Sequence, residues 1–201
     1  MTTALVVVDL QNAFCRPDGS FVRRGLAIEG IDEIVARCRA LVALAEARDW
    51  LVVPTRLAYR ADHADAGLLV ARNPAIRALG GYVEGSFDAA LVDALEPPAG
   101  SPRWLVVRKT RYDPFCGTTL ADDLRARGVG ELVVCGVATN VCVESTVRHA
   151  HDLDFPVRVV EDAVASYDRR LHEASLETMG RHFATRVTHA QLAAERTTPV
   201  G

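Results

Sequence analysis

Residues 4–9 of the chain read Ala4-Leu5-Val6-Val7-Val8-Asp9. A short, continuous apolar run that stops at a charged residue is typical of a strand buried on both faces of a parallel sheet. The run is much shorter than the roughly 18 apolar residues of a membrane span, and no basic residue precedes it as in a signal peptide. We therefore expect a buried strand over 4–8, no membrane segment and a cytoplasmic location.

Outward from this strand, apolar runs alternate with helical patterns. Apolar residues at helical spacing predict helices over 31–48, 120–127, 140–153 and 171–183. Short apolar runs predict strands over 51–55, 104–107, 131–135, 157–160 and 185–188. A loop is expected over 11–28, and a mostly irregular segment with short helices near 74–79 and 87–95 is expected over 56–100. Strands separated by helices predict an α/β fold whose parallel sheet is covered by helices on both faces.

The composition is that of one globular domain. The chain has 201 residues, with 23 basic and 26 acidic side chains and a net charge of −3. This length suits one domain, which we place at 1–190, followed by a polar, loosely held tail over 191–201. A weakly acidic chain lacks the basic surface of a nucleic-acid-binding protein. The five cysteines match no disulfide or zinc spacing and are expected to be free thiols in a reducing cytosol.

Three side chains suited to covalent catalysis follow three different strands. Asp9 follows the first strand, Cys142 follows the fourth, and Lys109, the only lysine of the chain, follows the third. In open parallel sheets the ligand site lies beyond the carboxyl ends of the strands, so these side chains are expected to meet at one edge. A cation or a helix N-terminus favours the nucleophilic thiolate, and a carboxylate can move its proton. The competing interpretation is structural, with Asp9 as a turn cap and Cys142 as core.

Three segments carry a family resemblance. Residues 6–14 (VVVDLQNAF), 109–115 (KTRYDPF) and 136–146 (GVATNVCVEST) resemble the signature blocks of the isochorismatase-like cysteine hydrolases. The resemblance implies a Rossmann-like three-layer sandwich with about six parallel strands and a catalytic triad of Asp9, Lys109 and Cys142. It also implies a cis peptide between Val137 and Ala138, an oxyanion hole made by the amides of Ala138 and Cys142, and no cofactor.

The same resemblance implies hydrolysis of a C–N bond in a small amide, ureido or carbamoyl compound, through a thioester and with release of ammonia. Segments 59–67 and 85–88 are similar to the branch that acts on ureidoacrylate, biuret and carbamoyl amides. Nicotinamidases carry metal ligands after the second strand, where this chain has Leu57 and Tyr59. Neither metal binding nor nicotinamidase activity is therefore expected, and the nearby loop 62–65 (DHAD) is interpreted as a solvated turn.

Several side chains near the predicted edge are candidates for substrate contact. Aromatic rings could wall a pocket, and asparagines could hydrogen-bond a planar amide; these candidates are Phe14, Tyr59, Phe87, Tyr112, Phe115, Asn12 and Asn140. Core packing or turn formation is the competing interpretation for each. Arg111 is either a partner for a substrate carboxylate or a solvated loop residue.

Two other functions stay open from the sequence alone. One is an isochorismatase-type vinyl-ether hydrolase, and the other is a non-catalytic protein that binds a small molecule on the same fold. The expected partner is a small-molecule amide, with no nucleic acid or membrane partner. Relatives are commonly dimers or tetramers, so a homodimer or homotetramer is expected.

Overall fold

The computed structural model describes residues 2–195 and contains one six-stranded sheet. The strands are β1 (Thr2–Val8), β2 (Leu51–Leu57), β3 (Val107–Lys109), β4 (Val129–Val137), β5 (Val157–Ala165) and β6 (Thr185–Val187). Their order across the sheet is β3-β2-β1-β4-β5-β6, and every neighbouring pair is parallel. This confirms the predicted α/β fold and its Rossmann-like sheet, in which the strand order reverses next to β1.

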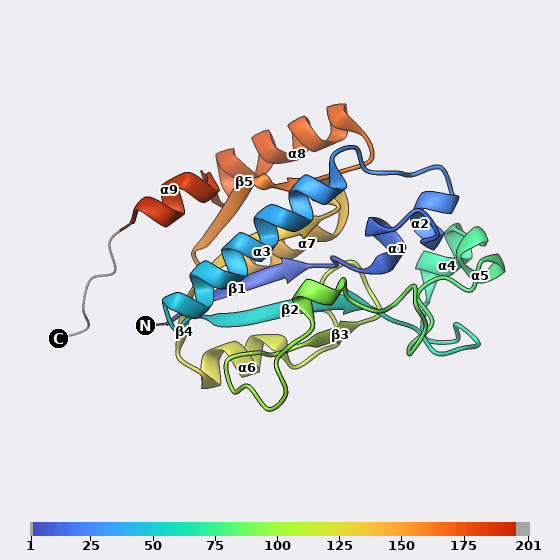
Figure 1. Ribbon diagram of the computed structural model, residues 1–201, viewed down its shortest axis with the longest axis horizontal. Coiled ribbons are helices and arrows are strands. Elements are labelled where there is room, and N and C mark those ends of the chain that lie inside the picture. Colours follow the sequence, from blue (N-terminus) through green and yellow to red (C-terminus); the bar gives the residue numbers. More distant parts are fainter. Residues whose placement is uncertain (1, 196–201) are drawn as a thin grey trace.

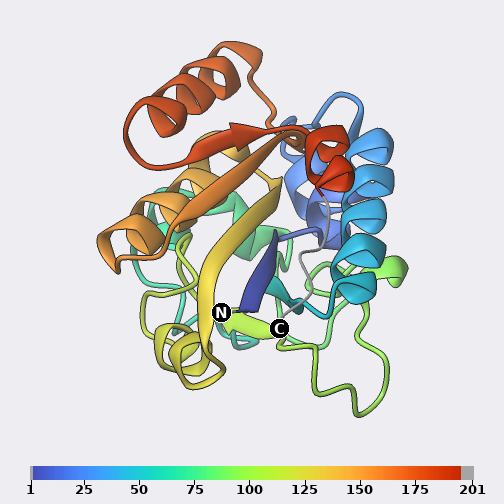
Figure 2. The ribbon, with the colours of Figure 1, turned by 90° about the vertical axis from the view of Figure 1, so that its left-hand side faces the viewer.

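Helices cover both faces of the sheet (Figure 2). One face carries α3 (Ile31–Ala47) and α9 (His189–Ala194), and the other carries α6 (Leu120–Ala126), α7 (Glu144–Asp152) and α8 (Arg169–His182). The short helices α1 (Asn12–Cys15), α2 (Ser20–Arg23), α4 (Leu68–Arg72) and α5 (Ala75–Ala78) lie near the end of the sheet to which the strand arrows point (Figure 1). None of the described helices is long and apolar enough to cross a membrane.

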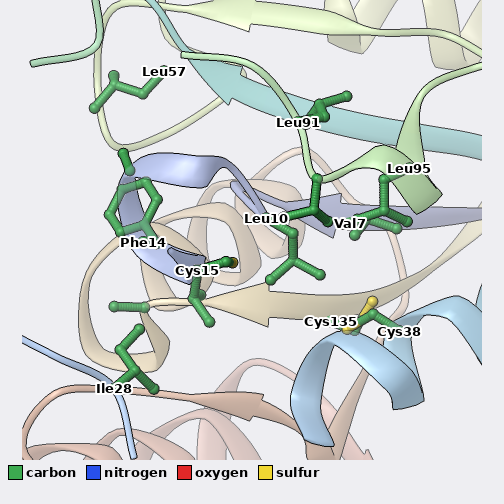
Figure 3. Close-up of a cluster of buried hydrophobic side chains, with 14 of the residues drawn as sticks. Val7, Leu10, Phe14, Cys15, Ile28, Cys38, Leu57, Leu91, Leu95 and Cys135 are labelled. Carbon is green, nitrogen blue, oxygen red and sulfur yellow. The ribbon is translucent and has the colours of Figure 1, made fainter. Parts of the chain in front are cut away.

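The two faces of β1 supply two separate hydrophobic cores. Leu5 and Val7 pack in the core beneath α3, whereas Val6 and Val8 pack in the core beneath α6, α7 and α8. Figure 3 shows part of the first core, where Val7 and Leu10 lie beside Cys38 and Cys135. A strand buried on both faces needs apolar residues at every position, which explains the uninterrupted run at 4–8.

Most expected elements are confirmed, with boundaries displaced by a few residues. The helix expected over 31–48 is α3, and the strands expected over 131–135 and 157–160 are the centres of β4 and β5. The helix expected over 171–183 is α8, which begins at Arg169 because the Asp168 side chain accepts a hydrogen bond from the Leu171 amide. That contact is an N-cap, which satisfies one of the free amides of the first turn.

The loop expected over 11–28 is wrong in part, because it contains α1 and α2. Each of these helices has only four residues, too few to show a helical period in the sequence. They form through tertiary packing, in which the Phe14 and Phe21 rings contact each other with centroids 4.8 Å apart and planes tilted by 50°. The segment thus closes over the carboxyl ends of the strands.

Three further boundaries differ. β3 begins at Val107 and not at Trp104, because β3 pairs with the last residues of β2, which end at Leu57. Trp104 makes only an isolated bridge to Val52. The helix expected near 87–95 is reduced to a 3-10 turn, η1 (Asp93–Leu95), because Leu91 bridges to Gln11 instead. α4 was not expected. Residues 191–194 of the expected tail belong to α9, which ends at Ala194 and buries Leu192; residues 196–201 of that tail lie outside the described part.

Gly136 is required where β4 passes β1. Its φ angle is +110°, and a Cβ there would lie 2.2 Å from the carbonyl oxygen of Val8. We expect Gly136→Ala to lower the free energy of unfolding by about 3 kcal/mol or more, because backbone strain and overpacking add. Urea titration followed by circular dichroism measures the loss. Gly128→Ala, where φ is +67° and the space for a Cβ is open, should cost only about 1–2 kcal/mol; equal losses would contradict the steric argument.

Candidate active site

Asp9, Lys109 and Cys142 meet at the carboxyl edge of the sheet. Asp9 directly follows β1, Lys109 ends β3, and Cys142 lies in η2 (Thr139–Val143), a π-helical turn that joins β4 to α7. The Lys109 Nζ lies 2.7 Å from the Asp9 Oδ2, and both side chains are fully buried. The Cys142 thiol is within hydrogen-bonding reach of both. The three side chains picked from strand ends therefore form one buried cluster.

The carboxylate of Asp9 is held by Thr55, a residue that the sequence patterns did not indicate. Thr55 Oγ1 donates to Asp9 Oδ1 at 2.7 Å and accepts from the Asp9 amide at 3.2 Å. Lys109 is held in turn, because its Nζ donates to the Tyr112 carbonyl at 2.5 Å. Within the described residues, Asp9 Oδ2 accepts no well-aligned hydrogen bond despite its ion pair. That oxygen is open to a proton from the thiol.

Burial sets the protonation of the cluster. Burial and the Asp9 carboxylate raise the pKa of the Cys142 thiol well above its usual range, and Lys109 lowers it by less. Burial also lowers the pKa of Lys109, but Asp9 and Cys142 raise it by more, so the ammonium stays charged. Lys109 thus acts on the thiol pKa in the expected direction, but burial outweighs it. A raised thiol pKa favours a neutral Cys142 beside the Asp9–Lys109 ion pair.

This protonation state predicts how the free thiol reacts with pH. Because the pKa of Cys142 is raised, its alkylation by iodoacetamide should be slow at pH 7 and should still rise about tenfold per pH unit up to pH 9. An exposed small-molecule thiol levels off near its ordinary pKa of about 8.5. The rates are measured by mass spectrometry of the peptide that contains Cys142. An alkylation rate of Cys142 that levels off below pH 8 would show a preformed thiolate and contradict the raised thiol pKa.

A cavity of about 280 Å³ opens above the thiol, and Ala138 and Cys142 both line it. Its walls are mostly aromatic and aliphatic and include Phe14, Phe21, Tyr82, Tyr112 and Tyr167. A wider groove of about 1000 Å³ adjoins it, sharing Leu69, Asn73 and Tyr112, but is lined by no residue of the buried cluster. The small cavity is therefore the candidate reaction chamber, and the wider groove adjoins it.

The bond between Val137 and Ala138 is a cis peptide, as the resemblance implied. Within the described residues, the Ala138 amide donates no backbone hydrogen bond. Cys142 lies in the first turn of the helical segment, where amides have few intrahelical partners. Both amides thus suit the stabilisation of a negative oxygen near the thiol.

The predicted substrate-contacting residues divide into two groups. Phe14 and Tyr112 line the cavity. The others do not: Phe115 packs against Phe155 in the core beneath α7, and Phe87 is exposed with its carbonyl bound by the Asn12 side chain. Asn140 instead accepts a hydrogen bond from Ser166. These four side chains therefore build loops and core and do not line this cavity, and their contact with substrate stays a prediction.

Tyr59 takes an intermediate position. Its ring is fully buried against Tyr82, and it does not line the open cavity. Its hydroxyl has no hydrogen-bond partner within the described residues, and burial together with nearby groups that include Cys142 raises its pKa. A buried hydroxyl without a partner is costly. The Tyr59 hydroxyl is thus a donor available beside the reaction chamber.

The residues at the end of β2 and just beyond it do not fit a metal ion. Leu57 has no ligand atom, and Tyr59 is a poor ligand. In the nearby loop, His63 Nε2 is bonded to the Gly81 carbonyl at 2.8 Å, Asp62 is paired with Arg60, and Asp65 is paired with Arg108. Within residues 2–195 no three His, Cys, Asp or Glu side chains cluster as ligands.

Comparison with known proteins agrees with the geometry. Residues 3–191 match the family model described as the isochorismatase domain. Ureidoacrylate amidohydrolase RutB of Methylobacterium radiotolerans is 36% identical over 196 residues, which cover 90% of this chain and 74% of that protein. An isochorismatase family protein of Desulfovibrio vulgaris has a TM-score of 0.82 and 32% identity, with 96% of each chain covered. N-carbamoylsarcosine amidase of Thermoplasma acidophilum has a TM-score of 0.72 and 26% identity, covering 98% of this chain and all (100%) of that one.

The fold and these relatives together show that the protein is a hydrolase. Within this class, the chain belongs to the isochorismatase family. The family and the fold expected from the three sequence segments are thereby confirmed.

Proposed function

We propose that the protein is a cysteine-dependent amidohydrolase that cleaves a C–N bond of a small amide or ureido compound and releases ammonia. The observation that carries the proposal is the buried Cys142 thiol beside the Asp9–Lys109 ion pair, at the floor of a small cavity. A nucleophile within reach of its base, with that base held by a third group, is the arrangement that covalent catalysis needs.

The first half of the reaction forms a thioester. Asp9 Oδ2 takes the thiol proton as Cys142 Sγ attacks the amide carbon. The amides of Ala138 and Cys142 donate to the oxygen that becomes negative. When the C–N bond breaks, Asp9 returns its proton to the nitrogen, which leaves as ammonia.

The second half releases the acid and restores the thiol. Asp9 removes a proton from a water molecule, and the resulting hydroxide attacks the thioester carbon. The C–S bond breaks, and the proton on Asp9 passes to the sulfur. Lys109 stays charged throughout and compensates the negative charge as it moves between Asp9, the sulfur and the substrate oxygen.

Two features narrow the substrate. The cavity of about 280 Å³ is at the small end of ligand pockets, which suits a molecule of few atoms. A relative at 36% identity is named a ureidoacrylate amidohydrolase, and a structural relative is an N-carbamoylsarcosine amidase. Ureidoacrylate is the first compound to test.

The test is ammonia release from purified protein with ureidoacrylate, biuret, N-carbamoylsarcosine, maleamate and nicotinamide, and pyruvate release from isochorismate in parallel. Ammonia from any amide, with a thioester on Cys142 seen by mass spectrometry after acid quenching, is the expected result. Pyruvate release without ammonia would instead indicate a vinyl-ether hydrolase. Binding without turnover of any compound would indicate a non-catalytic protein.

A further inference from the structure

The cavity above Cys142 has one charged side chain besides its reactive floor. Arg24 lines it, and the other residues that line it are apolar, aromatic or neutral polar. No Asp or Glu among the described residues lines this cavity. A cation that faces a largely apolar chamber without a counter-ion favours an anionic occupant, since burying an unpaired charge is costly.

Arg24 has contacts that orient it but none that neutralise it. It follows α2 and is half-buried, and its guanidinium carbon lies 5.7 Å from the centroid of the Phe21 ring. Its Nη2 donates to Asn73 Oδ1 across a long 3.4 Å. Within residues 2–195, no carboxylate forms an ion pair with it. Most of its hydrogen-bonding capacity therefore stays available for a ligand.

Arg24 and the thiol act on the same space. Burial raises the pKa of both Tyr82 and Tyr112; among the smaller causes, Cys142 adds to this rise and the charge of Arg24 opposes it. Both tyrosines line the cavity with Arg24 and Cys142. The guanidinium and the thiol are thus two chemically different groups that line the same small chamber.

We propose that Arg24 binds a carboxylate of the substrate while Cys142 attacks the amide or ureido carbonyl of the same molecule. The substrate class is then a small amide or ureide that carries a carboxylate a few bonds away. A planar guanidinium pairs with a carboxylate through two parallel hydrogen bonds, which fixes orientation as well as charge. This inference rests on the proposed function for its reaction, but the anion subsite stands on Arg24 alone.

Arg111, the earlier candidate for this role, is engaged elsewhere. Its Nη1 donates to the carbonyls of Asp65 and Thr110 at 2.9 and 2.8 Å. It lines the wider outer groove together with Arg72, and neither of them lines the reaction chamber. The position of Arg24 is therefore the better one for a group bound at the same time as the thiol attacks.

The test uses two alkylating probes of similar size, the anion iodoacetate and the neutral iodoacetamide. Their rates with Cys142 are measured by mass spectrometry of the Cys142 peptide, so that modification of the exposed Cys116 is counted separately. We expect Arg24→Gln to lower the iodoacetate-to-iodoacetamide rate ratio about tenfold, the size of effect of one charge-assisted contact. Arg23→Gln removes the neighbouring exposed charge and should leave the ratio within about twofold of the wild type.

This readout does not depend on turnover, so failure of the amidohydrolase proposal and failure of the Arg24 proposal are distinguishable. An unchanged ratio in Arg24→Gln would overturn the anion subsite. So would a loss seen in Arg72→Gln or Arg111→Gln instead, because it would place the anion in the outer groove. Where an amide is turned over, Arg24→Gln should raise KM about tenfold for a carboxylate-bearing amide and little for its neutral counterpart.

Discussion

Cys142→Ala should abolish ammonia release while the protein stays folded. Removing a covalent nucleophile that acts as a unit with its base costs on the order of 10⁴-fold or more in kcat, because no other group can form the thioester. The thiol is buried but neutral, so its loss leaves no unpaired charge, and the free energy of unfolding should change by only about 1 kcal/mol. Initial rates of ammonia release measure the loss of activity, and a thermal unfolding curve measures the stability.

Cys116→Ser is the matched control for the nucleophile. Cys116 is exposed on the loop before α6, and replacing it should leave kcat unchanged. Full activity in Cys142→Ala, or its loss in Cys116→Ser, would contradict the assignment of the nucleophile. Cys142→Ser should lose ammonia release as Cys142→Ala does, because a buried hydroxyl is a weaker acid than the thiol it replaces.

The sheet could be predicted from the sequence because each strand is an apolar run and each long helix shows a period. Strand ends then placed Asp9 and Cys142 on one edge, since parallel strands share their carboxyl ends. Lys109 lies at this edge as expected, although its strand begins three residues later than predicted. Its long side chain reaches past the end of β2 to Asp9, so the ion pair forms in spite of the shift.

The walls of the chamber could not be predicted in the same way. Phe14 and Arg24 lie on or beside helices of four residues, which show no period and form only when packed. Aromatic residues look alike in sequence whether they line a cavity, as Tyr112 does, or fill the core, as Phe115 does. The role of Thr55, which holds Asp9, could have been inferred from one feature of the sequence. It is a polar residue at the end of a predicted apolar strand, as Asp9 is.

Asp9→Asn should lose both activity and stability. The substitution removes the base, which costs about 10²–10⁴-fold in kcat. It also leaves the Lys109 ammonium fully buried without its counter-ion, and breaking a buried pair on one side costs about 3–5 kcal/mol. Urea unfolding and initial rates measure the two effects. A variant that unfolds like the wild type would show that the ion pair is not buried as described.

A second substitution separates the two roles of Asp9. Adding Lys109→Met to Asp9→Asn replaces the orphaned ammonium by an uncharged side chain of similar length, so most of the lost stability should return while activity does not.

Asp9→Asn alone should also gain stability from pH 7 to pH 10. Burial without a partner lowers the pKa of Lys109 below its unfolded value, so the unfolded state binds more protons and the stability rises with pH. The double variant has no such buried ammonium and should lack that slope, and a return of activity with stability would show that Asp9 only holds the fold.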